Sequence, residues 1–331
     1  WRGKATSEID RENLEISTNP YYRQEGKSSN NGGGLFAQLS ADYDIDAKNS
    51  LVFSARFPLN RFANDNDLTT YTGDDKGQLP FLFRRASDVV FRRLGTDLNL
   101  DYRKTFDKDS DKEFSMSAQY SYTDRKSDYE TDQFSESGAL NYREVSPNLG
   151  SDREIIFAAD YLHPLSKAVT AEGGAKAIFR NVFSGIFYDT LDLASQQYLR
   201  DLSRNNTFDY DQNVAAAYGQ ISFPITAQLK ARAGLRYEHT FIDGLTQSDG
   251  NQFENDYASW VPSGLLAWTL PDRSTLKFSY NRRIQRPSMY FLNPYVNYND
   301  PTNISYGNPE LKPEVTESLE LSYGFAKGTA N

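Results

Sequence analysis

The chain has 331 residues and a formal net charge of −9, which argues against a nucleic-acid partner. It has no cysteine, which excludes disulfides, thiolate metal sites and a catalytic thiol. Only 38% of its residues are hydrophobic, although 14% are aromatic. Soluble domains average about 45–50% apolar residues. This composition suits a membrane β-barrel, in which only alternate residues face lipid, and no segment approaches the ~18 apolar residues of a spanning helix.

The main pattern along the chain is alternation with a period of two. In residues 315–325 the odd positions hold Val, Glu, Leu, Leu, Tyr and Phe, and the even positions hold Thr, Ser, Glu, Ser and Gly. Residues 227–241 alternate in the same way. A helix would mix the two sets on every face, so the pattern predicts strands with two unlike faces. Twelve such strands are predicted, near residues 4–16, 33–43, 50–60, 90–106, 113–126, 153–163, 167–182, 207–223, 226–241, 257–269, 274–286 and 315–325.

The predicted connections alternate in length. Short ones, rich in Asp, Pro, Ser and Asn, are expected at 44–49, 107–112, 164–166, 224–225 and 270–273. Long ones are expected at 17–32, 61–89, 127–152, 183–206, 242–256 and 287–314. Short turns at one end and long loops at the other are typical of an antiparallel transmembrane outer-membrane β-barrel, with the turns in the periplasm. A β-sandwich or propeller would give more even spacing, whereas a small barrel closed by twelve strands stays compatible with the pattern.

Residues 280–323 read YNRRIQRPSMYFLNPYVNYNDPTNISYGNPELKPEVTESLELSY. This stretch resembles the strand, loop, strand signature of TonB-dependent receptors, in the variant of the outer membrane β-barrel family related to SusC-type receptors. The hairpin at 213–240 is similar to the one that precedes this signature. The matching positions are Arg282, Arg283, Arg286, Pro287, Ser288, Leu292, Asn293, Pro294, Asp300, Pro301, Gly307, Asn308, Pro309, Leu311, Pro313 and Glu314.

The resemblance implies a barrel of 22 strands that is closed by an N-terminal plug and energised through TonB. It also implies a surface lipoprotein that helps to capture the ligand. On this basis residues 1–331 are expected to be part of such a barrel, as an open curved sheet or partial barrel. The signal peptide and plug are expected ahead of Trp1, and further strands after Asn331.

The signature also has a direct physical interpretation. Its prolines remove ladder donors and fix φ, so residues 286–314 are expected to form an external loop of defined shape. Gly307 and Asn308 would tolerate positive φ. The signature arginines could bind an anionic ligand or lipid headgroups, pair with loop carboxylates, or line the lumen. On the preceding hairpin, Lys230, Arg232, Arg236 and Glu238 share the polar face and are candidate lumen-lining residues.

Aromatic residues favour a membrane location, and no sequence motif indicates an enzyme. Aromatic residues near strand ends suit interfacial girdles, although cross-strand packing would also explain them: Tyr120, Tyr122, Tyr161, Phe223, Tyr237, Phe241, Trp268 and Tyr280. His163 and His239 lie far apart without zinc-ligand spacing, and no catalytic group or cofactor motif stands out.

Two functional hypotheses follow for a protein in the outer membrane of a Gram-negative bacterium. The first is a receptor and transporter that takes up a large or scarce ligand, such as an iron chelate, oligosaccharide or peptide, with energy coupled through TonB. The second is a passive channel or a structural or adhesive barrel.

Overall fold

The computed structural model describes residues 1–13, 18–107, 110–247, 250–293 and 305–325. The described residues form one antiparallel sheet and a single helical turn. The elements are β1 (Arg2–Glu12), β2 (Tyr21–Asp46), β3 (Asn49–Gly73), β4 (Phe81–Asp107), β5 (Ser110–Phe134), β6 (Leu140–Pro164), β7 (Thr170–Ile186), β8 (Asp189–Asp192), β9 (Gln197–Arg200), β10 (Asn206–Pro224), β11 (Leu229–Thr246), β12 (Asn251–Thr269), β13 (Thr275–Gln285), α1 (Met289–Leu292) and β14 (Glu314–Gly324).

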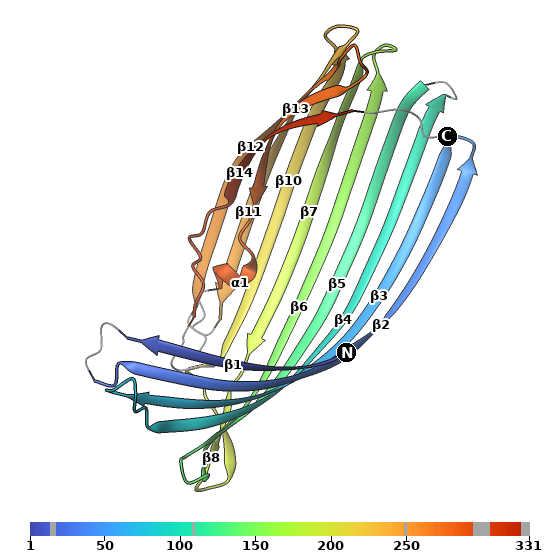
Figure 1. Cartoon of the computed structure of the whole chain (residues 1–331). Helices are drawn as coiled ribbons and strands as arrows, with labels where there is room; N and C mark the ends of the chain where they lie inside the picture. The colour runs from blue at the N-terminus through green and yellow to red at the C-terminus, as the bar shows by residue number, and fades with distance from the viewer. Residues whose placement is uncertain (14–17, 108–109, 248–249, 294–304, 326–331) are drawn as a thin grey trace.

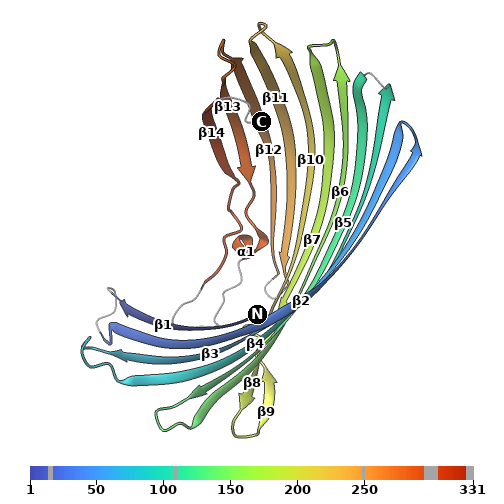
Figure 2. The same cartoon turned by 45° about the vertical axis from the view of Figure 1, so that its right-hand side comes forward.

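The sheet follows the chain. Its order is β1-β2-β3-β4-β5-β6-β7-β10-β11-β12-β13-β14, and the small β8–β9 hairpin attaches to β6. The twelve strands of this path correspond to the twelve predicted strands, so their number and order are confirmed. Among the described residues, β1 pairs only with β2 and β14 pairs only with β13. The sheet is therefore an open trough with two free edges, and α1 lies on its concave side (Figures 1 and 2).

The predicted lengths of the strands were wrong on one side. Tight turns join the strands at one end, as between Asp46 and Asn49. At the opposite end, strands continue through most of what the sequence predicted as long loops. β2 begins at Tyr21 inside the predicted loop 17–32, and only residues 135–139 separate β5 from β6. We call the two ends the turn end and the loop end.

The register assigns each residue to one of two faces, because directly paired residues of antiparallel strands lie on the same side and neighbours alternate. One face carries exposed apolar side chains along almost every strand, and we call it the outward face. The opposite face is concave and mainly polar near the turn end. Exposed apolar residues of the outward face include Leu35, Leu39, Tyr43, Phe53, Phe57, Leu59, Leu94, Leu100, Met116, Phe157, Phe179, Ile221, Leu235, Trp260, Leu266, Trp268, Phe278, Leu319 and Leu321.

The apolar band of the outward face has a definite upper limit. Toward the loop end its first charged residues are Arg61 on β3, Arg92 on β4 and Asp124 on β5, and further charged residues such as Asp65 and Asp88 follow on the outward face. The eight aromatic residues predicted for interfacial girdles all lie on the outward face. Such a band, bordered by aromatic rings, is the surface that a transmembrane barrel turns toward lipid.

Candidate functional site

The connection between β13 and β14 folds back onto the concave face. Its described residues, 286–293 and 305–313, are here called the inward segment. After Arg286 and Pro287 the chain makes the single turn α1 and places Leu292 against the sheet, where its side chain is 0% exposed. Leu292 packs in a cluster of buried residues from β7, β10 and β11, namely Val182, Phe208, Tyr210 and Ile242. An apolar anchor thus holds the segment inside the trough.

An ionic contact fixes the start of the inward segment. Arg286 forms an ion pair with Glu238 on β11, and its Nε donates a hydrogen bond to Thr240 Oγ1 at 3.1 Å. The Glu238 side chain is only 7% exposed, and its other oxygen lies 2.7 Å from Nε of Arg236. A carboxylate removed from water needs such partners, because an unpaired buried charge is costly. Glu238 is therefore shared between the barrel wall and the segment.

The second limb of the segment is tied to the first and to β12. Gly307 N donates to Asn293 O at 2.9 Å, and Asn308 N donates to Phe291 O at 2.7 Å. Asn255 Nδ2 donates to Pro309 O at 3.1 Å. A Cβ on residue 307 would lie 2.4 Å from Asn293 O, so glycine is required for close backbone approach. Neither Gly307 nor Asn308 has positive φ, so the tolerance predicted for them is not used in this structure.

A cavity of about 380 Å³ opens between the inward segment and the sheet. The segment contributes Met289, Tyr290, Phe291, Tyr306 and Asn308 to its lining, and the strands contribute Tyr129, Asn148 and Ser184. Its volume lies within the range of small-molecule sites, which are usually lined by aromatic side chains with a few polar groups. The cavity is therefore a candidate binding site on the concave face.

The signature arginines separate between the two faces. Arg282 lies on the outward face and donates from Nε to Glu317 Oε1 on β14 at 3.1 Å. Arg283 lies on the concave face, exposed, with no ion-pair partner among the described residues. Arg286 reaches Glu238, so the carboxylates that pair with these arginines lie on strands and not on loops.

The other predicted residues are placed as follows. Lys230, Arg232, Arg236 and Glu238 all lie on the concave face, and Arg232 Nε donates to Ser222 Oγ at 3.0 Å. Pro287, Pro309 and Pro313 lie outside strands, and Leu311 lines the cavity. Asn293 ends α1, and Glu314 begins β14. Pro294, Asp300 and Pro301 lie outside the described residues.

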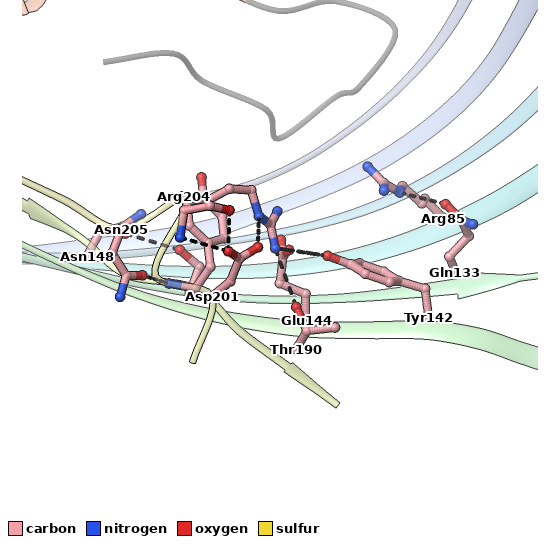
Figure 3. A network of polar contacts seen from close by, with 12 residues as sticks. Arg85, Gln133, Tyr142, Glu144, Asn148, Thr190, Asp201, Arg204 and Asn205 are labelled. Atoms are coloured by element: carbon pink, nitrogen blue, oxygen red, sulfur yellow. Dashed lines mark hydrogen bonds and ion pairs between the residues drawn. The ribbon is translucent and has the colours of Figure 1, made fainter. Parts of the chain in front are cut away.

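A second polar network, missed by the sequence analysis, lies at the loop end beside the β8–β9 hairpin. Figure 3 shows Arg204 between Glu144 and Asp201, at 2.5 Å and 2.7 Å. Its guanidinium also lies 4.4 Å from the ring centre of Tyr188. Burial opposes the charge of Arg204, but hydrogen bonds to Asp201 and Glu144 more than offset this, so the pKa of its guanidinium is raised. The network pins the hairpin to β6.

One signal in the sequence could have revealed the buried cluster. In β10, odd positions near the turn end carry the apolar residues of the outward face, such as Ile221 and Phe223. Near the loop end the pattern inverts, because Phe208 and Tyr210 occupy even positions while Asp209 and Asp211 occupy odd ones. The inversion marks where apolar side chains turn from lipid to the interior.

The described residues hold neither a metal-binding cluster nor a membrane-spanning helix. They contain no group of His, Cys, Asp or Glu side chains that could hold a metal ion. None of their helices is long and apolar enough to cross a membrane.

An open antiparallel sheet with an apolar outward face and a polar concave face defines a class, the transmembrane β-barrel proteins of outer membranes. The chain belongs to the outer membrane protein β-barrel family, whose sequence model matches residues 104–331. It is thus a protein of the outer membrane of a Gram-negative bacterium. In such barrels short turns lie in the periplasm, so the loop end is extracellular.

Solved structures are similar to this chain at low sequence identity. The copper transporter OprC matches over 98% of this chain with a TM-score of 0.53 and 12% identity. The siderophore receptor PiuA from Acinetobacter baumannii matches over 97% of this chain with a TM-score of 0.48 and 9% identity. The chain covers 51% and 54% of these two proteins, so it spans about half of their length. A search of curated protein sequences gave no match.

Proposed function

We propose that this chain forms about half of the barrel of a TonB-dependent receptor of the SusC-related type. In this proposal the barrel captures a large or scarce ligand at the cell surface, such as an iron chelate, an oligosaccharide or a peptide. A plug encoded ahead of Trp1 would close the lumen and transmit energy from TonB, and a surface lipoprotein would assist capture. The barrel wall itself supplies no catalytic step.

The observation that carries this proposal is the open trough. Twelve strands leave both edges unpaired among the described residues, so further strands are needed to close the sheet. Barrels with many more than twelve strands have wide lumens, and 22-stranded outer-membrane transporters hold a plug. The shared fold with OprC over half of its length fits this size.

The inward segment supports a receptor in a second way. It is tied to the concave wall by Arg286, Leu292 and Pro309, and it forms one wall of the 380 Å³ cavity. A receptor needs a binding site there, because a scarce ligand must be held before transport.

The test is conductance of the full-length gene product in a planar lipid bilayer, with and without the region encoded ahead of Trp1. A plugged receptor gives a closed protein whose conductance rises sharply when that region is deleted. Equal, open conductance of both proteins would refute the receptor and support a passive channel. Heat-modifiable gel mobility of both proteins checks that each barrel is folded.

A further inference from the structure

Three cations of the outward face lie in one row across neighbouring strands. Arg61 on β3 pairs in register with Arg92 on β4, and Arg92 pairs with Lys126 on β5. Side chains directly opposite each other on adjacent strands lie about 4.5–5.5 Å apart at Cβ, and like charges in this arrangement are destabilising. We call these three residues the basic row. Its stability calls for negative charge nearby.

The chain supplies only part of that charge. Asp128, the next outward residue of β5 toward the loop end, lies 3.2 Å from Arg92 and 3.4 Å from Lys126. Arg61 is exposed and has no ion-pair partner among the described residues. Asp128 therefore pairs with two of the three cations and leaves Arg61 without a carboxylate partner among the described residues. Arg92 and Lys126 also keep about half of their side-chain surface exposed, at 51% and 45%.

The position of the basic row points to its partner. One step toward the turn end, Leu35, Leu59 and Leu94 form a row on β2, β3 and β4. Their side chains are 68%, 46% and 53% exposed and belong to the apolar band. Lipid tails cover this band, so the basic row lies at the level of the headgroups on the extracellular side.

We propose that the basic row binds the phosphate groups of the phosphorylated glycolipid that forms the outer leaflet. Arginine and lysine form strong charge-assisted hydrogen bonds with phosphate, and a phosphate between Arg61 and Arg92 would relieve their repulsion. Asp128 holds Arg92 and Lys126 in place and competes with the phosphate. This inference depends on the lipid-facing surface and not on the proposed transport function.

The test measures binding of phosphorylated lipid A glycolipid to the full-length protein purified in mild detergent. The triple variant R61Q/R92Q/K126Q is expected to bind about tenfold more weakly, because it loses charge-assisted contacts with phosphate. A tenfold change in Kd corresponds to about 1.4 kcal/mol of binding free energy. Dephosphorylated glycolipid should bind the native protein as weakly as the phosphorylated form binds the variant. Inorganic phosphate as competitor should have little effect, because it lacks the acyl chains that the neighbouring leucines contact.

A control lies on two of the same three strands, β4 and β5. Arg93 and Arg125 are paired in register one residue away and face the concave side, so R93Q/R125Q removes two positive charges from the opposite face, as R92Q/K126Q does from the outward face. This variant is expected to bind the glycolipid as the native protein does. Equal losses in both variants would mean that total charge matters and would overturn the proposal.

A second variant acts in the opposite direction. D128N releases Arg92 and Lys126 from their carboxylate and should tighten glycolipid binding severalfold without removing any cation. It also keeps the proposal testable if the triple variant fails to fold, which heat-modifiable mobility would reveal. Unchanged or weaker binding by D128N, or equal binding of dephosphorylated glycolipid, would contradict a phosphate site.

Discussion

The same strands obey different rules at their two ends. Near the turn end the outward face is apolar and the concave face is polar, as Ala217 and Lys176 illustrate on β10 and β7. Near the loop end the outward face is charged, and on β10 the apolar side chains have moved to the concave face, where Phe208 and Tyr210 are buried. The apolar face of the sheet therefore changes along the strands. Near the turn end apolar side chains lie on the outward face, where lipid covers them. Near the loop end of β10 they lie on the concave face, where the inward segment covers them.

The difference between the turn end and the loop end is tested most strongly at Leu292, which anchors the inward segment to the sheet. Leu292→Ala should weaken attachment of the segment by about 2–5 kcal/mol, because a fully buried leucine is lost from a packed cluster. Limited proteolysis should then cut within residues 286–313 while the barrel remains folded. Tyr290→Ala is the control, since its side chain is 69% exposed and should leave protection nearly unchanged.

Two adjacent alanines sharpen the contrast at membrane level. Ala217 faces outward within the apolar band, and Ala216 faces inward beside Glu238. Ala217→Arg should cost about 2–4 kcal/mol of folding free energy in lipid, as charged residues do near the bilayer midplane. Ala216→Arg should cost far less. Urea unfolding in lipid vesicles compares the two, and similar losses would mean that the faces are assigned wrongly.

At the junction of the two regions, Glu238→Gln tests the shared carboxylate. Arg286 and Arg236 would lose their common partner, and a hydrogen bond to a charged group contributes about 1.5–3 kcal/mol. The segment should become more sensitive to protease, but less than in Leu292→Ala. Glu172→Gln is a suitable control, because Glu172 lies on the concave face but its partners are Tyr218 and Gln220. No change in Glu238→Gln would show that the ion pair does not help to hold the segment.

The smallest effect concerns acid pH at the loop end. Hydrogen bonds from Ser203 and Arg204 lower the pKa of Asp201 below its ordinary value of 3.8. A lowered folded-state pKa stabilises the hairpin region above pH 3.8, and this contribution is lost as the pH falls through the lowered value. Hydrogen exchange of residues 189–205 should therefore accelerate in that acid range. Asp201→Asn should remove this part of the pH dependence, whereas an unchanged profile would assign it to other carboxylates.

These differences also explain how far the sequence could be interpreted. Alternation identified all twelve main strands because lipid and water make two unlike faces. The alternation pattern did not identify the parts of β3 and β4 beyond Arg61 and Arg92 toward the loop end. Water covers both faces of the sheet there, so the sequences of these parts resemble those of loops. Alternation also gave no partner for Arg286, since the contact with Glu238 spans 48 positions and depends on how the segment folds. The need for glycine at 307 came from backbone packing, which no local pattern encodes.

The extension of the strands beyond the bilayer determines which surface antibodies and bacteriophages can recognise on the cell. At several places the loop end shows only tight connections, such as residues 135–139 between β5 and β6. An antibody or a bacteriophage that approaches this surface meets pleated strand faces more often than flexible loops. Escape from such agents would then proceed by exchanging single outward side chains, while the hydrogen-bonded ladder beneath them stays unchanged.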